Sequence, residues 1–494
     1  MLEPKRKGKV NLRLIFILII ALTVRLYKLN IPLADHHSWR QADTASVARN
    51  FIKEGFDFLR PKIDNFTPLH APDMPNSERL FLAEPPIYNS LVALLYYFFG
   101  INLALARGVS ILSSLGSIIF IYYFVKETDS QEVALWAALF FALLPFSIYY
   151  SRVILPEPFM VFTSLGMIYF FKNWLVRGNI TSFFLALFWA MISLTQKVFP
   201  LFLALPMTYL IFKIWGWRKL LHKKYLLALF IYLVISILPI VLWRRWISQY
   251  PAGIPPYDWL FNQGGIRFRP AFFRWIFDER IGKLILGCWG LPFLVIGLAL
   301  KPTQKSGWFY HWWLVSFLIY IMVFAAGNVT HDYYQIVFVP IGAVFLARGA
   351  DFLFSKAPKR YLNRFVSLTA AGLSLVFMLA FSWYQVRDFY NLQGGVDLAG
   401  KAVDSLTPKD ALILTGDSND ASLLYNCNRY GWSGGYASFF PNEVASIEKA
   451  RLLGAQYFVT TKFNQFENLE FGRYLKDKFR LIKQTDQYII FDLR

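Results

Sequence analysis

Long apolar runs, separated by shorter polar segments, dominate the sequence. Most runs hold roughly 20 residues, and a helix of that length crosses the roughly 30 Å hydrocarbon core of a bilayer. We interpret these runs as membrane-spanning helices at about residues 12–30, 104–125, 131–150, 157–172, 181–196, 199–213, 225–243, 283–300, 309–326, 334–350 and 364–384. The pattern therefore predicts a polytopic α-helical membrane protein with about 11 transmembrane helices.

The basic residues between these runs predict the orientation of the chain. Residues 5–9 and the basic loops after alternate runs belong in the cytoplasm under the positive-inside rule, so the N-terminus lies inside and the C-terminus outside. A cleaved signal peptide is the alternative for the first run. However, no small-x-small cleavage site follows it, and Arg25 and Lys28 interrupt its outer end. The inner loops carry Lys126, Lys172, Arg177, Lys213, Arg218, Lys219, Lys223, Lys224, Lys301, Lys305, Lys356, Lys359, Arg360 and Arg364.

One apolar run is shorter than the others. Residues 87–100 number about 14, which is too few for an ordinary span and typical of an interfacial helix. If this run crossed, every later loop would invert and the strongly basic loops would face outward. We therefore place it on the outer face, so that residues 31–103 form a long first outer loop with interfacial helices.

The tail of the chain changes character. Short apolar segments alternate there with amphipathic ones such as residues 442–453, a pattern typical of a small α/β domain. We predict an extracytoplasmic α/β domain over residues 391–494, after a transmembrane domain over residues 1–390. Its role is open between capping the active site, binding the acceptor and a purely structural one. The buried strands are expected at residues 411–415, 456–460 and 488–491.

Composition excludes a soluble protein, because 56% of the residues are hydrophobic, 19% are aromatic and the mean hydropathy is +0.40. In a soluble chain the net charge of +20 would suggest a nucleic-acid partner. Here the basic residues lie in short loops, where orientation and anionic lipid headgroups explain them, so we expect a membrane and no nucleic acid. Cys288 lies in an apolar run and Cys427 in the tail, and no disulfide is expected between them.

Two acids stand at the outer membrane boundary. Asp35 follows the outer end of the first run, and Glu157 begins the fourth run between two prolines. In the predicted topology both carboxylates face the same side, and an acid at this depth is costly unless it is paired or functional. We predict catalytic roles for both. A helix-capping or surface role is the alternative for Asp35.

These features resemble the GT-C superfamily of integral-membrane glycosyltransferases that use polyprenyl-phosphate sugars. The chain is most similar to prokaryotic relatives of the protein O-mannosyltransferases and of the lipid A aminoarabinose transferase. Residues 35–50 resemble the acidic start of that family's first outer loop, and Arg107 with its apolar run resembles the second span. Glu157 falls where these enzymes carry a second acid. Glu84 and the two prolines after it fall on a motif with Lys before the prolines in the aminoarabinose enzymes, so here the chain departs from the pattern.

The resemblance implies that a sugar moves from a polyprenyl-phosphate donor to a hydroxyl of a protein, lipid or glycan acceptor. Transfer would occur on the outer face of the plasma (inner) membrane and would invert the anomeric centre. Asp35 would be the general base for the acceptor hydroxyl, and Glu157 the second catalytic acid. Further substrate-binding roles are predicted for His36, Arg40, Glu84, Arg152, His331 and Tyr333.

The departing lipid phosphate requires cations or N–H donors near it. For each basic candidate the alternative is snorkelling to the lipid headgroups. The candidates are Arg152, Lys197, Arg267, Arg269 and the cluster at residues 331–334.

No residue is assigned as a metal ligand, and no cofactor is certain. His36, His37 and His70 share the first loop with several carboxylates, so a divalent metal is an open alternative. No helical His pair and no Cys ligand set supports it.

Two other functional classes compete with the enzyme. A polytopic transporter or lipid flippase would share the apolar composition, as would a non-catalytic assembly subunit. Secondary transporters often show paired halves with broken helices. This chain instead has a long acidic loop near one end and a folded outer domain at the other.

Overall fold

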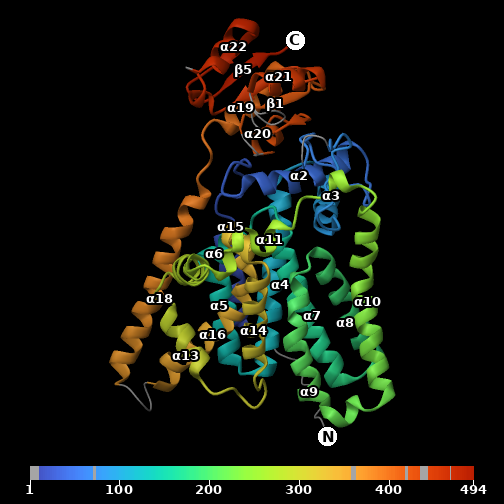
Figure 1. The fold of residues 1–494 in the computed structure, drawn as a ribbon. Helices are drawn as coiled ribbons and strands as arrows, with labels where there is room; N and C mark the ends of the chain where they lie inside the picture. The colour runs from blue at the N-terminus through green and yellow to red at the C-terminus, as the bar shows by residue number, and fades with distance from the viewer. Residues whose placement is uncertain (1–10, 71–73, 358–362, 418–420, 434–442, 468) are drawn as a thin grey trace.

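The computed structural model describes residues 11–70, 74–357, 363–417, 421–433, 443–467 and 469–494. The chain is mostly helical: a bundle of long helices carries a small α/β domain at one end (Figure 1). The bundle contains α1 (Leu12–Arg25), α4 (Leu103–Thr128), α5 (Gln131–Leu143), α6 (Pro145–Tyr150), α7 (Glu157–Arg177), α8 (Ile180–Gln196), η1 (Phe199–Leu203), α9 (Ala204–Leu220), α10 (Lys223–Ile247), η4 (Arg274–Ile285), α13 (Leu291–Ala299), α14 (Phe309–Val323), η5 (Asp332–Val337), α16 (Phe338–Asp351), η6 (Phe352–Lys356) and α18 (Arg364–Val386).

Six helical segments in the described part of the chain are long and apolar enough to cross a membrane, judged by length and composition. Shorter apolar helices account for the other predicted runs, and the number of crossings stays a prediction. The six segments are Leu103–Thr128, Glu157–Arg177, Phe199–Leu220, Lys223–Ile247, Asp332–Lys356 and Arg364–Tyr390.

The predicted run at residues 131–150 is helical but broken. Leu144 leaves the helical region at ψ 119° because the residue before a proline disfavours it, and Pro145 then starts α6. The break frees carbonyls at the end of α5, and the buried guanidinium of Arg25 in α1 donates to two of them, Ala142 at 2.9 Å and Phe141 at 3.3 Å. Arg25 therefore stabilises this break.

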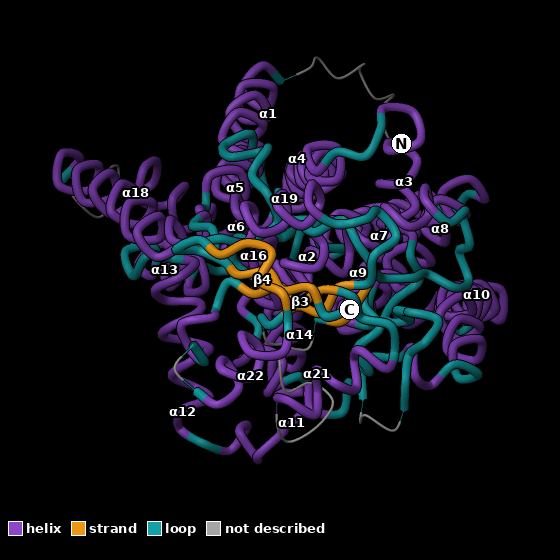
Figure 2. The backbone as a smooth tube through the Cα atoms, turned by 90° about the horizontal axis from the view of Figure 1, so that it is seen from above, coloured by secondary structure: helices purple, strands orange, loops and turns teal. Residues whose placement is uncertain are grey.

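Glycine allows α13 and α16 to pack closely. A Cβ at Gly297 would lie 1.9 Å from the carbonyl oxygen of Phe345, and one at Gly349 would lie 2.0 Å from that of Phe293. Small residues at such contacts let two backbones approach inside a membrane bundle. Two outer helices are different: α10 and α18 stand at opposite edges of the molecule (Figure 2) and expose large apolar side chains, which is typical of lipid contact.

The loop at residues 31–103, called the first loop below, caps one end of the bundle with short helices (Figure 1). It contains α2 (Ser38–Lys53) and α3 (Ile87–Phe99), the latter in the run predicted to be interfacial. α3 packs on α2, and Tyr88, Val92 and Tyr96 are buried on that side. Other short elements at this end and in the loop after α10 are η2 (Pro251–Gly253), α11 (Trp259–Asn262), η3 (Gln263–Phe268), α12 (Pro270–Phe273), α15 (Ala325–Thr330) and η7 (Arg387–Tyr390).

The C-terminal domain is built on a five-stranded mixed sheet of order β2-β1-β3-β5-β4, with strands in orange in Figure 2. Apolar clusters pack on its two faces. β1 pairs in parallel with β2 and β3, while β5 pairs antiparallel with β3 and β4. The three predicted strands correspond to β1, β3 and β5; β2 and β4 were not predicted. The elements are α19 (Val396–Leu406), β1 (Ile413–Thr415), α20 (Ala421–Asn426), β2 (Gly431–Trp432), α21 (Glu443–Leu452), β3 (Tyr457–Thr460), η8 (Phe463–Gln465), α22 (Glu470–Lys478), β4 (Arg480–Gln484) and β5 (Ile489–Asp492).

The first loop is joined to this domain through backbone hydrogen bonds. The N–H of Phe66 donates to the carbonyl of Gly431 in β2 at 2.7 Å, and the N–H of Gly431 donates to the carbonyl of Asp64 at 3.1 Å. Arg49 on α2 pairs with the Asp64 carboxylate and lies over the ring of Tyr425. These hydrogen bonds therefore fix the first loop against the C-terminal domain.

Candidate active site

A cavity of about 470 Å³ lies at the end of the bundle that the first loop covers. α2 and residues 81–84 of the first loop form one wall, and the turn between α8 and η1 forms a second. The outer end of α10 and residues 254–261 form a third. Residues 331–334 close the inner side, so segments far apart in the sequence meet around one space.

Two buried ion pairs stand at the wall of this cavity. The guanidinium of Arg40 lies 2.6 Å from the Glu84 carboxylate, and the ammonium of Lys197 lies 2.5 Å from that of Glu157. Burial is the largest single effect and lowers the pKa of Lys197, but Glu157, Tyr334 and Glu84 together raise it by more, so the pKa lies above its ordinary value and the ammonium is kept. The wall thus presents fixed positive charge close to carboxylates.

Aromatic rings surround these charges. His331 stacks on Tyr333 with ring centroids 5.2 Å apart and lies edge-on to Trp259 at 5.4 Å. Burial and the neighbouring charges of His37 and Lys197 together lower the pKa of His331 to about 3, so His331 is neutral at physiological pH. A neutral imidazole among aromatic rings offers hydrogen bonds and a flat apolar face rather than charge.

Several polar atoms at the cavity lack a partner within the described residues. Both amide atoms of Gln196 and the second carboxylate oxygen of Glu157 make no hydrogen bond there, although both side chains are almost fully buried. Gln196 also lines the cavity. Buried polar atoms are nearly always satisfied, so this wall is built to face a polar ligand or water.

Asp35 lies outside the cavity. Its side chain and that of Arg152 have 0% exposure, and their charged groups are 3.1 Å apart. The other oxygen of Asp35 accepts from Gln41 at 2.8 Å, and Arg152 also donates to the carbonyl of Lys28 at 2.7 Å. The carboxylate predicted as the base is thus enclosed by protein and has no open path to an acceptor in this conformation.

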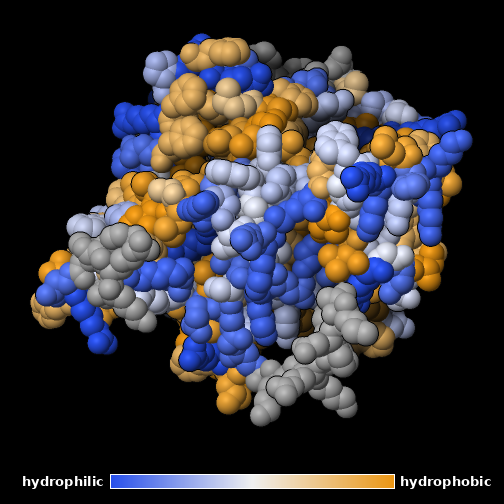
Figure 3. All heavy atoms as spheres, turned by 90° about the horizontal axis from the view of Figure 1, so that it is seen from below, coloured by the Kyte–Doolittle hydropathy of each residue, from blue (hydrophilic) through white to orange (hydrophobic). Residues whose placement is uncertain are grey.

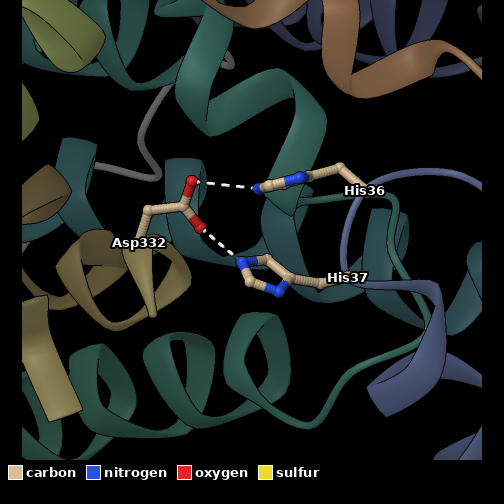
Figure 4. A group of neighbouring side chains, drawn as sticks. All are labelled: His36, His37 and Asp332. Atoms are coloured by element: carbon tan, nitrogen blue, oxygen red, sulfur yellow. Dashed lines mark hydrogen bonds and ion pairs between the residues drawn. The ribbon is translucent and has the colours of Figure 1, made fainter. Parts of the chain in front are cut away.

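His36 contacts Asp332 rather than the cavity. His36 and its neighbour His37 each place Nε2 within hydrogen-bond reach of Asp332, at 3.1 and 2.8 Å (Figure 4). Tyr150 donates its phenol hydrogen to the same carboxylate. This group stands just behind the cavity wall, because the ring of His37 packs edge-on against Tyr333 at 5.1 Å.

The predicted site residues therefore divide into separate groups. Arg40, Glu84, His331 and Tyr333 line one cavity, and Glu157 joins it through Lys197. Asp35 and Arg152 form a closed pair, and His36 belongs to the Asp332 cluster. Of the remaining phosphate candidates, Arg267 donates to the backbone carbonyl of Val323, and Arg269 is exposed.

Several cavity residues were not predicted as site residues, among them Trp39, Arg244 and Trp259, whereas Asp43 lies in the acidic segment at residues 35–50 and was one of the next candidates for the base after Asp35. Asp43 had a detectable signal, because it follows Arg40 by three residues and helical neighbours at that spacing share a face. Trp259 and Arg244 carried no such signal, since they lie about 200 residues from α2 in the sequence and meet it only in the fold.

The geometry defines a polar, charged cavity at the mouth of an apolar helical bundle. Residues 83–243 match the family model of dolichyl-phosphate-mannose-protein mannosyltransferases. The matched segment includes Glu84, Glu157, Lys197 and all of α7. No curated protein sequence matches the chain.

Solved structures extend the likeness to the whole chain. ArnT from Cupriavidus metallidurans bound to undecaprenyl phosphate is similar with a TM-score of 0.66 at 13% identity, over 97% of each chain. AglB, the oligosaccharyltransferase of Archaeoglobus fulgidus, in complex with an inhibitory peptide and a dolichol-phosphate, gives 0.58 at 11% identity over 96% of this chain and 74% of that one. The arabinofuranosyltransferase AftD from Mycobacteria gives 0.59 at 11% identity over 98% and 40%. The predicted resemblance is thereby confirmed: the chain has the fold of the GT-C membrane glycosyltransferases.

Proposed function

We propose that this protein is a membrane glycosyltransferase that moves a sugar from a polyprenyl-phosphate-linked donor to an acceptor hydroxyl. The cavity is the observation that carries the proposal, because it combines Arg40, Lys197 and Arg244 with the carboxylates Asp43 and Glu84. The cations would stabilise the charge of the departing lipid phosphate, and a carboxylate would take the proton of the acceptor. ArnT bound to undecaprenyl phosphate and AglB bound to dolichol-phosphate support a lipid phosphate as the leaving group.

An apolar pocket supports the lipid nature of the donor. It adjoins the charged cavity at Phe199, which lines both spaces. Its other walls come from α7, η1, α14 and α16, and include Met160, Leu165, Trp313 and Phe317. The pocket holds only about 30 Å³, so a polyprenyl chain would run along its apolar border rather than fill it, while the phosphate meets Lys197 where the two pockets adjoin.

We assign the general base to Asp43 in place of Asp35. Asp43 is on the cavity wall one helical turn from Arg40, whereas both oxygens of Asp35 are held inside the protein. Glu84 is held by Arg40, and Glu157 fixes the ammonium of Lys197. Direct attack of the acceptor oxygen on the anomeric carbon would invert its configuration.

We further propose that the cavity and the domain at residues 391–494 face outward from the plasma membrane, after 11 crossings that start inside. The first loop and the C-terminal domain lie at the same end (Figure 1), and the turn between α9 and α10 lies at the other. Hydrophilic side chains gather over that other end (Figure 3), where the basic loops support a cytoplasmic position.

Transfer assays with purified protein in nanodiscs test the function. A labelled sugar on polyprenyl phosphate should move to a hydroxyl acceptor, releasing free polyprenyl phosphate. Translocation of the intact donor between leaflets without cleavage would instead identify a flippase and refute the proposal.

Cysteine labelling tests the orientation. In a Cys288→Ser background, Asp486→Cys on the exposed turn before β5 should react with an impermeant maleimide on intact spheroplasts. His222→Cys, at the start of α10, should react only after lysis. The native Cys427 does not interfere, because it is completely buried. The opposite labelling pattern would invert the proposed topology.

A further inference from the structure

The cluster of His36, His37 and Asp332 offers three metal-binding atoms in one small volume. One ring nitrogen of each histidine and one carboxylate oxygen of Asp332 all lie within 4.8 Å of one another. Nε2 of His36 lies 3.1 Å from one oxygen of Asp332, and Nε2 of His37 lies 2.8 Å from the other. Neighbouring ligand atoms around a tetrahedral Zn²⁺ with bonds of about 2.0–2.1 Å are roughly 3.3 Å apart, so the group is compact enough to surround one ion.

The backbone is shaped to bring the two adjacent histidines together. Consecutive side chains in an extended segment point to opposite sides, but His37 has φ 53° and ψ 30°, in the left-handed region. This turn places both rings toward Asp332, with ring centroids 4.1 Å apart (Figure 4). A strained backbone at a non-glycine residue is typical of a site where side-chain placement matters.

The surroundings of Asp332 fit a ligand that is held in place. Its side chain has 3% exposure, and Tyr150 donates to the oxygen that His37 approaches. The guanidinium of Arg280 lies 3.6 Å from the other oxygen, and this positive charge opposes a cation. Two imidazoles with a single carboxylate suit Zn²⁺ and neighbouring transition metals, whereas Mg²⁺ and Ca²⁺ rely on oxygen ligands.

We propose that His36, His37 and Asp332 form a binding site for a divalent transition-metal ion of the Zn²⁺ type. Each imidazole would bind through Nε2 and carry its hydrogen on Nδ1. The side chain of His36 is 32% exposed, so solvent reaches the site and a fourth coordination position is open. The ion would join the start of α2 to η5, two segments separated by almost 300 residues.

The site does not depend on the proposed enzyme activity, because its ligands lie behind the cavity wall rather than in it. It would act on the cavity through packing: His37 contacts Tyr333 and His331, and both of these line the cavity. Bound metal would therefore hold this wall against the first loop.

Metal binding by the full-length protein in nanodiscs tests the proposal. The protein is stripped with chelator, incubated with Zn²⁺ or Co²⁺, desalted, and analysed for metal by mass spectrometry; calorimetry gives the affinity. We expect one ion per chain, a visible absorption band for Co²⁺, and a rise in the unfolding temperature with Zn²⁺. Mg²⁺ should neither bind tightly nor stabilise.

Four variants separate this site from adventitious binding. His37→Ala and Asp332→Asn should lose the ion, and Tyr150→Phe, which removes only a hydrogen bond to a ligand, should weaken binding about 10-fold. His70→Ala is the matched control, because His70 lies in the same loop and contacts the carbonyl of Ile254 instead.

Unfolding curves of the metal-free variants show whether each still folds. Absence of metal from the wild type, or equal binding by His37→Ala, Asp332→Asn and His70→Ala, would overturn the proposal. Normal sugar transfer by a metal-free wild type would leave it standing, since the proposal concerns binding rather than the reaction.

Discussion

Two charged regions built from the first loop differ in what surrounds them. The side chains of Asp35 and Arg152 have no exposed surface, and the carboxylate accepts from a guanidinium and an amide, while Nε of Arg152 has no partner among the described residues. Around Asp43, charged groups stand beside a cavity of about 470 Å³, and Gln196 and Glu157 leave polar atoms without partners among the described residues. The first region holds together the loop start and the segment before α7, while the second is prepared for a ligand. An acid that the sequence places at the membrane boundary can therefore belong to a closed ion pair or to a ligand cavity.

The largest effect should come from Asp43→Asn, which removes the proposed base with almost no change in volume. General-base catalysis contributes about 10²–10⁴-fold, or roughly 3–5 kcal/mol in the activation free energy. We expect that loss in the rate of sugar transfer, with unchanged unfolding and donor binding. Glu78→Gln, an exposed acid in the same loop, is the control. Transfer at the wild-type rate by Asp43→Asn would remove the distinction between the two regions.

Asp35→Asn should act on stability instead. It leaves the guanidinium of Arg152 buried without its anion, and breaking a buried pair in this way costs about 3–5 kcal/mol. Denaturation in detergent should show the loss, while the transfer rate per folded molecule stays near that of wild type. Asp35→Leu combined with Arg152→Met should restore stability. A folded Asp35→Asn protein that binds donor and does not transfer would return the base to Asp35.

Lys197→Gln should weaken donor binding, because a charge-assisted hydrogen bond to phosphate contributes about 1.5–3 kcal/mol, or roughly 10–100-fold in affinity. Lys197→Arg keeps the charge and should retain most of the affinity. Titration with polyprenyl phosphate, restricted to the folded fraction because Glu157 loses its partner, measures the change. Equal affinities for Gln and Arg at this position would mean that the ammonium serves only Glu157.

The smallest effect concerns two neighbouring arginines at the outer end of α10. Arg244 lines the cavity and Arg245 does not, although both are exposed. We expect Arg244→Gln to reduce donor affinity about 2–5-fold, or roughly 0.5–1 kcal/mol, because solvent screens this charge. Arg245→Gln should have no effect. Equal losses in the two variants would indicate general attraction to the membrane surface.

The local pattern of apolar residues was sufficient to predict most of the helices. Most of the apolar runs are helical, because a helix satisfies the backbone polar groups of an apolar segment in lipid. The run at residues 283–300 is divided by a turn at residues 286–290. The interruption near Leu144 depends on a single proline, and a hydropathy pattern does not resolve it. β2 contains only Gly431 and Trp432, and it forms by pairing with β1 rather than by its own propensity, so no periodicity marks it.

The candidate site was predicted only in part, because it also depends on contacts between segments that are distant in the sequence. Position near the membrane boundary singled out Asp35, Glu157 and Arg152, but position does not distinguish a satisfied carboxylate from an open one. Each acid pairs with a cation that is distant in the sequence. Arg152 lies beside Asp35, and Lys197 lies beside Glu157. The third proposed metal ligand, Asp332, was likewise separated from the histidines by most of the chain.

The attachment of the first loop to the C-terminal domain has a consequence for the entropy of binding. The loop is tied at Ala34, whose carbonyl accepts from Gln393, and again at Phe66 through Gly431. Residues between these ties, including α2 with Arg40 and Asp43, are ordered when the protein folds rather than when a substrate arrives. Binding therefore avoids an ordering cost of about 0.5–1.5 kcal/mol for each side chain that would otherwise be immobilised. The ties to the C-terminal domain would favour binding in this way.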